Sequence, residues 1–224
     1  MATRQFVFWG AGGHARVLAD LIALHGDRLL ALFDNDPAVC SPWPAVQVYH
    51  GAAGLAAWLA ANPAAGLQAA VAIGGARGLE RCRIARQLRA AGFALSPLVH
   101  PGALVAASVT LGAASQVLAG AVVGSGAEAG EGVIVNTAAS VDHECVLGDG
   151  VHIAPQATLC GCVRVGAHTL IGPGAVIVPR IRIGSGVIVG AGSVVTRDLP
   201  DRVVAYGSPA RVIRPNSPAV PADG

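Results

Sequence analysis

Large aliphatic residues recur at every sixth position through the second half of the chain. The series begins at Val99 and runs without an insertion through seventeen members to Val195, and only Ala129 departs from Ile, Leu or Val. A second row, mostly of small or β-branched residues, follows four positions later, as at Ala121 and Val133. Neither an α-helix, with its period of 3.6, nor an alternating strand, with its period of 2, produces this spacing.

A period of six is typical of a triangular coil with three short strands per turn. Each strand supplies one large inward residue before a tight corner, and stacked coils pair every strand with those above and below it. Gly follows the aliphatic residue eight times, so we expect Gly and small polar residues to relieve corners that need positive φ. Over residues 98–199 the sequence resembles the hexapeptide-repeat acyltransferases, which implies a left-handed parallel β-helix.

The first half of the chain alternates apolar runs with amphipathic patterns. The apolar runs predict strands at Gln5–Trp9, Arg28–Phe33 and Ala69–Ile73. The amphipathic patterns predict helices at Arg16–Leu24 and Leu79–Ala91. This alternation implies a small parallel sheet with crossover helices. We therefore expect a Rossmann-like α/β domain over residues 1–97, an all-β left-handed β-helix domain over 98–199, and a cap with a flexible tail over 200–224.

A glycine-rich loop follows the first predicted strand. Gly10-Ala-Gly-Gly-His-Ala15, with Asp34 about twenty residues later, fits the dinucleotide fingerprint. An NAD enzyme and a purely structural turn are both open readings of this loop. A domain of some 95 residues has too few strands for a second mononucleotide half, whereas one half can still hold phosphates at a helix N-terminus. We favour a site for the nucleotide part of a substrate.

His143 is the strongest catalytic candidate. It lies two residues after the inward Val141, near a corner, between Asp142 and Glu144. A flanking carboxylate can stabilise an imidazolium, so His143 can act as a general base. The alternative is a solvated corner residue.

Three motifs together resemble the sugar acetyltransferases of the NeuD, PglD and PerB type. They are Asp142-His-Glu-Cys145, Gly148-Asp-Gly-Val-His-Ile-Ala-Pro155 and the N-terminal Gly-Gly-His loop. The resemblance implies that His143 is the general base and that Glu144 raises its basicity. It further implies acetyl-CoA contacts from His152, Pro173 and Ala191. The residues it implies for a nucleotide sugar are Gly12, Gly13, His14, Asp34, Asn35 and Gly74.

The expected function is that of an acetyl-CoA-dependent N-acetyltransferase acting on a nucleotide-activated amino sugar. A UDP- or GDP-4-amino-4,6-dideoxyhexose for surface-glycan biosynthesis is the substrate class that the resemblance favours. O-acetyl transfer to sialic acid or a related sugar, an NAD enzyme and a structural scaffold are the alternatives. A three-histidine zinc site of the β-helical carbonic anhydrase kind is not expected, since no column of His forms at eighteen-residue spacing. No metal is expected.

The composition of the chain argues against nucleic-acid binding and bears on where the protein is located. The 15 Arg, absence of Lys and 13 acidic residues give a net charge of +2, which argues against a nucleic-acid binder. The uncharged stretch 101–127 is long enough to span a bilayer, but it carries the same period of six, so no membrane span is expected. Five Cys in no recognisable framework and no signal peptide point to the cytoplasm.

The residues just before each inward aliphatic residue suggest that copies of this chain associate. This position should point outward, yet it is often apolar, and such residues would leave apolar surface on a monomer. The family that the chain resembles forms trimers, so we expect a homotrimer with active sites between subunits. The outward apolar residues are Val122, Ile134, Val146, Val176, Ile188 and Val194.

Overall fold

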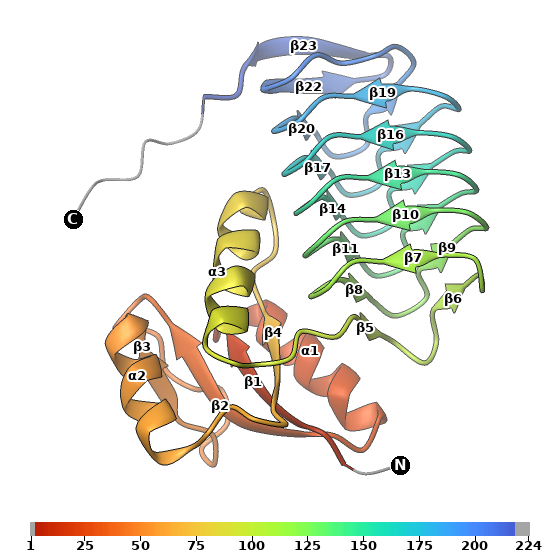
Figure 1. Ribbon diagram of the computed structural model, residues 1–224. Helices are drawn as coiled ribbons and strands as arrows, with labels where there is room; N and C mark the ends of the chain where they lie inside the picture. Colours follow the sequence, from red (N-terminus) through yellow and green to blue (C-terminus); the bar gives the residue numbers. More distant parts are fainter. Residues whose placement is uncertain (1–2, 218–224) are drawn as a thin grey trace.

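The computed structural model describes residues 3–217 and begins with a parallel sheet (Figure 1). The sheet has the order β3-β2-β1-β4, and one helix follows each of β1, β3 and β4. Its strands are β1 (Gln5–Trp9), β2 (Arg28–Asp34), β3 (Val48–His50) and β4 (Gln68–Val71). The helices are α1 (Gly13–Leu24), α2 (Gly51–Ala61) and α3 (Gly78–Ala90).

The expected strands and helices are all present in this N-terminal part, with ends that differ by a few residues. The helix after the glycine loop begins at Gly13 rather than Arg16. Two elements, β3 and α2, were not anticipated by the sequence pattern. They occupy the long stretch between Asp34 and Gly74 and add a fourth strand at one edge of the sheet.

The second half is a triangular β-helix, as the period of six predicts. Its strands form three parallel sheets, here called the first, second and third faces. The first face contains β5 (Leu98–Val99), β8 (Gln116–Val117), β11 (Ile134–Val135), β14 (His152–Ile153), β17 (Leu170–Ile171) and β20 (Ile188–Val189). The second contains β6 (Leu104–Val105), β9 (Val122–Val123), β12 (Ser140–Val141), β15 (Thr158–Leu159), β18 (Val176–Ile177) and β21 (Val194–Val195). The third contains β7 (Thr110–Leu111), β10 (Glu128–Ala129), β13 (Val146–Leu147), β16 (Arg164–Val165) and β19 (Arg182–Ile183).

Two different positions shape each corner. From Ala114 to Gly192, every sixth residue has a φ between +54° and +70°, and half of these fourteen are not glycine. The glycines that directly follow the inward aliphatic residue serve another purpose. A Cβ at Gly148, for example, would lie 2.8 Å from the backbone nitrogen of Ala167 in the next coil. Close stacking of coils, rather than positive φ, therefore explains the repeated glycine that we had assigned to the corner conformation.

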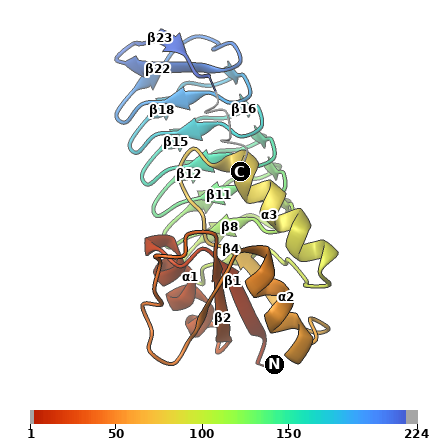
Figure 2. The ribbon, with the colours of Figure 1, turned by 90° about the vertical axis from the view of Figure 1, so that its left-hand side faces the viewer.

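The sheet of the N-terminal part is covered on both sides (Figure 2). One side packs against α2 and α3, with Phe33 and Trp58 in edge contact. The other side packs against α1 and against the first face of the β-helix, where Ile134 is fully buried. The expectation that Ile134 lies on an outward apolar surface is therefore wrong, because this chain's own α/β part covers it. Val122 and Val176, by contrast, are exposed.

The β-helix ends in an antiparallel hairpin. β22 (Val203–Gly207) extends the first face and pairs with β23 (Ala210–Pro215), and a turn at Ser208 and Pro209 joins them. Pro215 belongs to this strand, and the Asn216 N–H donates to the Arg202 carbonyl at 2.8 Å, so both residues are held against the cap. Residues 218–224 of the expected tail lie outside the described residues. Within residues 3–217, no helix combines the length and apolar character needed to cross a bilayer.

Candidate active site

A pocket of about 480 Å³ opens at the carboxyl ends of β1, β2 and β4. The sheet order places β2 and β4 on opposite sides of β1, so the pocket lies where the strand order reverses. Ligands of parallel α/β sheets bind at such points. All six residues expected to hold a nucleotide sugar line this pocket: Gly12, Gly13, His14, Asp34, Asn35 and Gly74.

The glycines of the loop have distinct physical roles. Gly10 has a φ of +107°, and a Cβ there would lie 2.5 Å from the Ala72 carbonyl oxygen. A Cβ at Gly12 or Gly13 would meet no atom within 4 Å. The first turn of α1 carries no acidic residue and no side-chain cap, so its N–H groups are suited to an anion. Gly10 thus allows the glycine loop to pass close to the backbone at the end of β4. Gly12 and Gly13 leave space in the pocket.

Asp34 connects the two loops that border the pocket. Its Oδ2 accepts a hydrogen bond of 2.9 Å from the Ala11 N–H, and its Oδ1 accepts one of 3.1 Å from the Asp36 N–H. Across the pocket, Arg77 donates to both carboxylate oxygens of Glu80, at 2.5 and 2.7 Å. Asp34 therefore shapes the glycine loop in addition to lining the pocket.

A hydrogen bond to Gln116 of the β-helix holds His14 in place. Gln116 on β8 donates from Nε2 to the Val71 carbonyl at 2.8 Å, which leaves its Oε1 as an acceptor for His14 Nε2–H at 2.6 Å. Burial lowers the pKa of His14, although the hydrogen bond to Gln116 opposes the shift. His14 is thus neutral at physiological pH, with the proton on Nε2.

His152 on β14 is buried beside the pocket and uses both ring nitrogens within the chain. Nδ1 donates to the Gly75 carbonyl at 3.3 Å, and Nε2 accepts from the Asn136 amide at 3.0 Å. Burial, helped by the positive charge of Arg81, lowers the pKa of His152 to about 4. The ring is therefore neutral near pH 7, and a bound molecule could contact Nε2 only by displacing the Asn136 amide.

This shift makes stability depend on pH. The pKa of His152 is about 4 in the folded chain and about 6.5 when unfolded, so the unfolded chain binds more protons between these values. The contribution of neutral His152 to the free energy of unfolding is complete above about pH 6.5 and is lost as the pH falls toward 4. We expect urea unfolding to show about 2 kcal/mol less stability from His152 at pH 5 than at pH 7. His152→Asn should flatten this slope; an unchanged slope would contradict the assignment.

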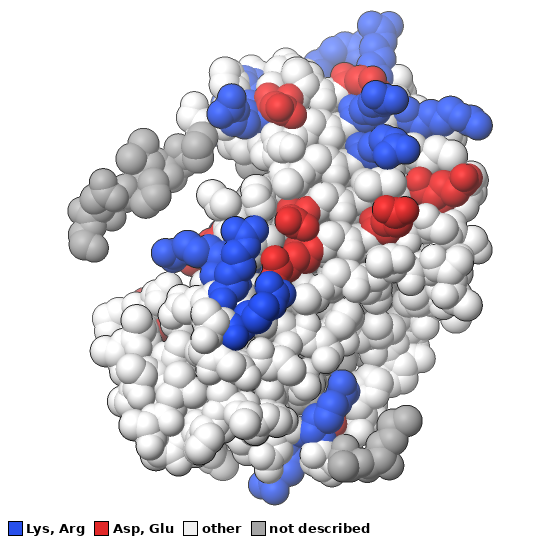
Figure 3. All heavy atoms as spheres, viewed as in Figure 1, with Lys and Arg blue, Asp and Glu red and all other residues white. Residues whose placement is uncertain are grey.

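Arg81 on α3 joins the pocket to the β-helix. Its side chain is fully buried, and its guanidinium donates to three backbone carbonyls. Nη1 reaches Ile73, which lines the pocket, at 2.9 Å, while Nε and Nη2 reach Gly132 and Gly150 of the β-helix, both at 2.7 Å. Burial lowers the pKa of Arg81 to about 10, so it stays charged at neutral pH. Nearby, Arg86 and Arg89 of α3 pair with Glu131 at the surface. Figure 3 shows basic and acidic side chains next to one another in the middle of this face of the molecule.

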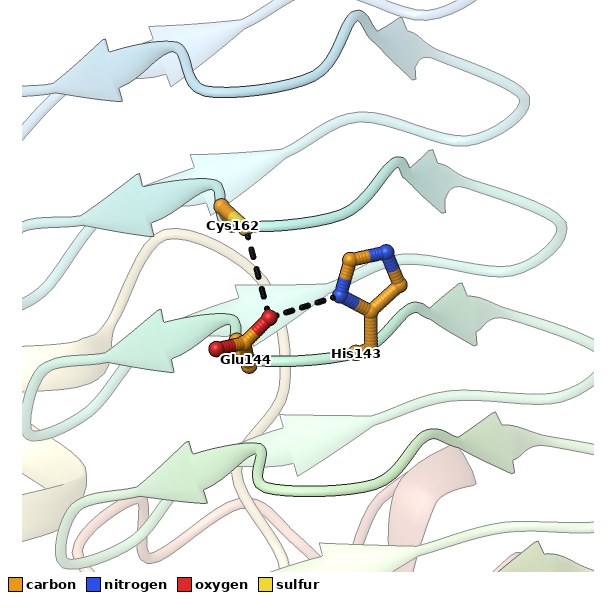
Figure 4. A group of neighbouring side chains, drawn as sticks. All are labelled: His143, Glu144 and Cys162. Atoms are coloured by element: carbon orange, nitrogen blue, oxygen red, sulfur yellow. Dashed lines mark hydrogen bonds and ion pairs between the residues drawn. The ribbon is translucent and has the colours of Figure 1, made fainter.

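His143 and Glu144 lie at the corner between the second and third faces, after β12 (Figure 4). Nδ1 of His143 is 3.0 Å from Oε2 of Glu144, and both side chains are more than half exposed. One coil later, a Cβ at Gly161 would overlap the edge of the His143 ring. The missing side chain at Gly161 therefore leaves room for the imidazole. With Nδ1–H donated to Glu144, Nε2 is free to accept a proton.

The single chain does not bring all the candidate residues together. Pro173 and Ala191 are exposed and lie one coil apart at the corner between the first and second faces, where Gly192 N–H donates to the Pro173 carbonyl at 2.8 Å. The pocket lies against the first face, through His14 and Gly74. In a triangular coil, the corner that carries His143 is opposite that face. His143 is therefore separated from the pocket of its own chain.

Comparisons with known proteins match both halves of the chain. Residues 5–88 match the family described as the PglD N-terminal domain, and residues 162–197 match the bacterial transferase hexapeptide family (six repeats). A comparison with curated proteins finds no match.

Several solved structures are similar over almost the whole chain. PerB from Caulobacter crescentus, in complex with CoA and GDP-perosamine, is 38% identical, with a TM-score of 0.85 over 95% of this chain and 98% of that chain. The acetyltransferase domain of PglB from Neisseria gonorrhoeae, in complex with acetyl coenzyme A, is 36% identical, with a TM-score of 0.83 over 95% and 100%. WeeI from Acinetobacter baumannii is 25% identical, with a TM-score of 0.82 over 94% and 100%.

These matches join the two halves of the fold in one family. The α/β part matches the N-terminal domain named after PglD, the coils match hexapeptide transferases, and the full-length likeness to PerB spans both. The chain belongs to the NeuD/PglD/PerB type of bacterial sugar acetyltransferases, a branch of the hexapeptide-repeat acyltransferases.

Proposed function

We propose that this protein transfers the acetyl group of acetyl-CoA to the amino group of a nucleotide-activated amino sugar. The observation that carries this proposal is the pocket at the carboxyl ends of β1, β2 and β4, with the N-terminus of α1 suited to a phosphate. PerB, which is similar over its length, was solved with CoA and GDP-perosamine. The substrate class we favour is a UDP- or GDP-linked 4-amino-4,6-dideoxyhexose.

In this proposal His143 is the general base. Nε2 takes a proton from the sugar amine as its nitrogen attacks the thioester carbonyl of acetyl-CoA. Glu144 holds the proton on Nδ1 and stabilises the imidazolium that forms. A backbone N–H stabilises the oxyanion of the tetrahedral intermediate. The intermediate collapses to the amide, and Nε2 of His143 gives its proton to the departing sulfur, so that CoA leaves as a thiol.

In this proposal, different parts of the chain bind the nucleotide sugar and acetyl-CoA. Residues 1–97 bind the nucleotide sugar through Gly12, Gly13 and the other four pocket residues. Residues 98–199 bind acetyl-CoA through Pro173 and Ala191, at the corner between the first and second faces, and through His152, which lies on the first face beside the pocket. The cap is the hairpin of β22 and β23. The five cysteines are free, which fits a reducing cytoplasm for the enzyme.

We infer that the active protein is a homotrimer, because a second copy is needed to complete the site. The outward row of the second face carries no charge: Leu104, Val122, Ser140, Thr158, Val176 and Val194. The outward row of the third face includes Glu128, Arg164 and Arg182, so the second face is better suited to packing against a neighbour. His143 of one subunit would then approach the pocket of another. Light scattering at micromolar concentration should give the trimer mass, and a monomer would refute the shared site.

Gly12→Val tests the pocket. A Cβ at Gly12 meets no atom within 4 Å, so valine should be tolerated by the fold and project into the space that the nucleotide would occupy. Calorimetric titration should show at least about tenfold weaker binding of the nucleotide sugar, since a bulky group blocks close backbone approach. Acetyl-CoA should bind with its original affinity.

NADH serves as the decisive control for this titration. An NAD enzyme would bind NADH tightly through the same glycine loop, and Gly12→Val would abolish that binding. Such a result, with no binding of any nucleotide sugar, would overturn the proposed function. Unchanged nucleotide-sugar affinity in Gly12→Val would instead reject the pocket assignment.

A further inference from the structure

Three side chains with zinc-binding chemistry converge at the corner between the second and third faces. His143 and Glu144 follow β12, and Cys162 occupies the position of Glu144 in the next coil (Figure 4). The distance from His143 Nδ1 to Glu144 Oε2 is 3.0 Å, and that from Cys162 Sγ to the same oxygen is 3.7 Å. The three ligand atoms all lie within 4.8 Å of one another. The coil repeat therefore assembles an imidazole, a carboxylate and a thiol around one point.

The spacing of these atoms is close to what tetrahedral zinc requires. Zinc binds nitrogen and oxygen at about 2.0–2.2 Å and sulfur at about 2.3 Å. Tetrahedral angles then separate nitrogen from oxygen by about 3.3 Å and sulfur from oxygen by about 3.6 Å. The observed distances of 3.0 and 3.7 Å differ from these values by a few tenths of an ångström. Since the side chains of His143 and Glu144 are more than half exposed, small rotations can close this gap.

We propose that His143, Glu144 and Cys162 bind one Zn²⁺, with water as the fourth ligand, and that zinc inhibits the transferase. The thiol releases its proton to solvent on binding, and Nδ1 gives up the hydrogen bond to Glu144. The proton of the neutral imidazole then resides on Nε2, which can no longer accept one from the amine. The inhibition rests on the proposed function, whereas the binding site rests on geometry alone.

Cobalt absorption tests the site without turnover. Co²⁺ can occupy tetrahedral zinc sites, and a thiolate ligand then gives an intense charge-transfer band in the near ultraviolet. We expect this band in the intact protein and in Cys160→Ser, a matched control two residues away and outside the cluster. Cys162→Ser should lose the band and bind Zn²⁺ at least about tenfold more weakly in competition with a chromophoric chelator.

Inhibition is tested in the same three proteins. Acetylated sugar should be measured by chromatography, because the thiol of released CoA itself binds zinc. Buffered Zn²⁺ should inhibit the intact protein and Cys160→Ser, and a chelator should restore activity, while Cys162→Ser should be at least about tenfold less sensitive.

The outcomes separate the two claims. No cobalt–thiolate band in the intact protein, or equal zinc affinity in Cys162→Ser, would refute the site. Zinc binding at Cys162 with unchanged acetyl transfer would refute the inhibition. A protein that shows the cobalt band but acetylates no sugar would count against the proposed function and support the metal site.

Discussion

Replacing His143 with alanine is expected to lower turnover by about 10²–10⁴-fold, which is the usual contribution of a general base. The side chain is more than half exposed and lies at a corner, so its removal should leave the coils folded. Acetyl-CoA affinity, measured by calorimetry, should be nearly unchanged, because Pro173 and Ala191, which we propose bind acetyl-CoA, lie at a different corner. Steady-state kinetics with the true acceptor should therefore show the loss in kcat.

Glu144→Ala provides the graded comparison. Glu144 contacts Nδ1 of His143 and not the Nε2 that takes the proton, so its loss should reduce turnover by less than the loss of His143 does. Near-normal turnover in His143→Ala would exclude this histidine as the base.

Arg81→Met is expected to lower the free energy of unfolding by about 3–5 kcal/mol, the largest stability effect that we expect from a single side chain here. The change leaves the carbonyls of Ile73, Gly132 and Gly150 without their buried donor. Urea unfolding measures the loss. Arg83→Met, on the exposed side of the same helix, is the control and should change stability by at most about 0.5 kcal/mol.

A second measurement separates the charge of Arg81 from its packing. The guanidinium helps to lower the pKa of His152 to about 4, so this pKa should rise in Arg81→Met. An NMR titration of the His152 ring follows it directly. An unchanged pKa of His152, or a loss of stability no larger than that of Arg83→Met, would show that Arg81 does not connect the pocket electrostatically to the β-helix.

The β-helix could be predicted from the sequence because each coil repeats one local rule. The inward residue, the corner and the strand pairing all recur at six or eighteen residues, so Val99 and Val195 could be placed in one register. The helix α2 could not be predicted in the same way. Its sequence, Gly-Ala-Ala-Gly-Leu-Ala-Ala-Trp-Leu-Ala-Ala, contains no charged residue, so apolar and polar positions cannot alternate around it.

The candidate site was predicted where its residues are close in sequence and missed where folding brings distant residues together. The glycine loop, Asp34 and His143 with Glu144 are local motifs. Arg81 shares the buried stripe of α3 with Ile84 and Leu88, but the sequence does not show that the β-helix packs there and supplies carbonyl acceptors for a buried guanidinium. For the same reason Ile134 was assigned to an exposed surface.

Acetyl transfer by the native protein is the decisive test of the proposed function. The protein should be incubated with acetyl-CoA and a panel of UDP-, GDP- and CMP-linked sugars, including 4-amino-4,6-dideoxyhexoses, while thiol release and the mass of each sugar are followed. We expect one thiol released per acetyl group gained, only with a nucleotide-linked amino sugar, and an amide in the product. Release of CoA with O-acetylation of sialic acid, or no transfer to any amino sugar in the panel, would contradict it.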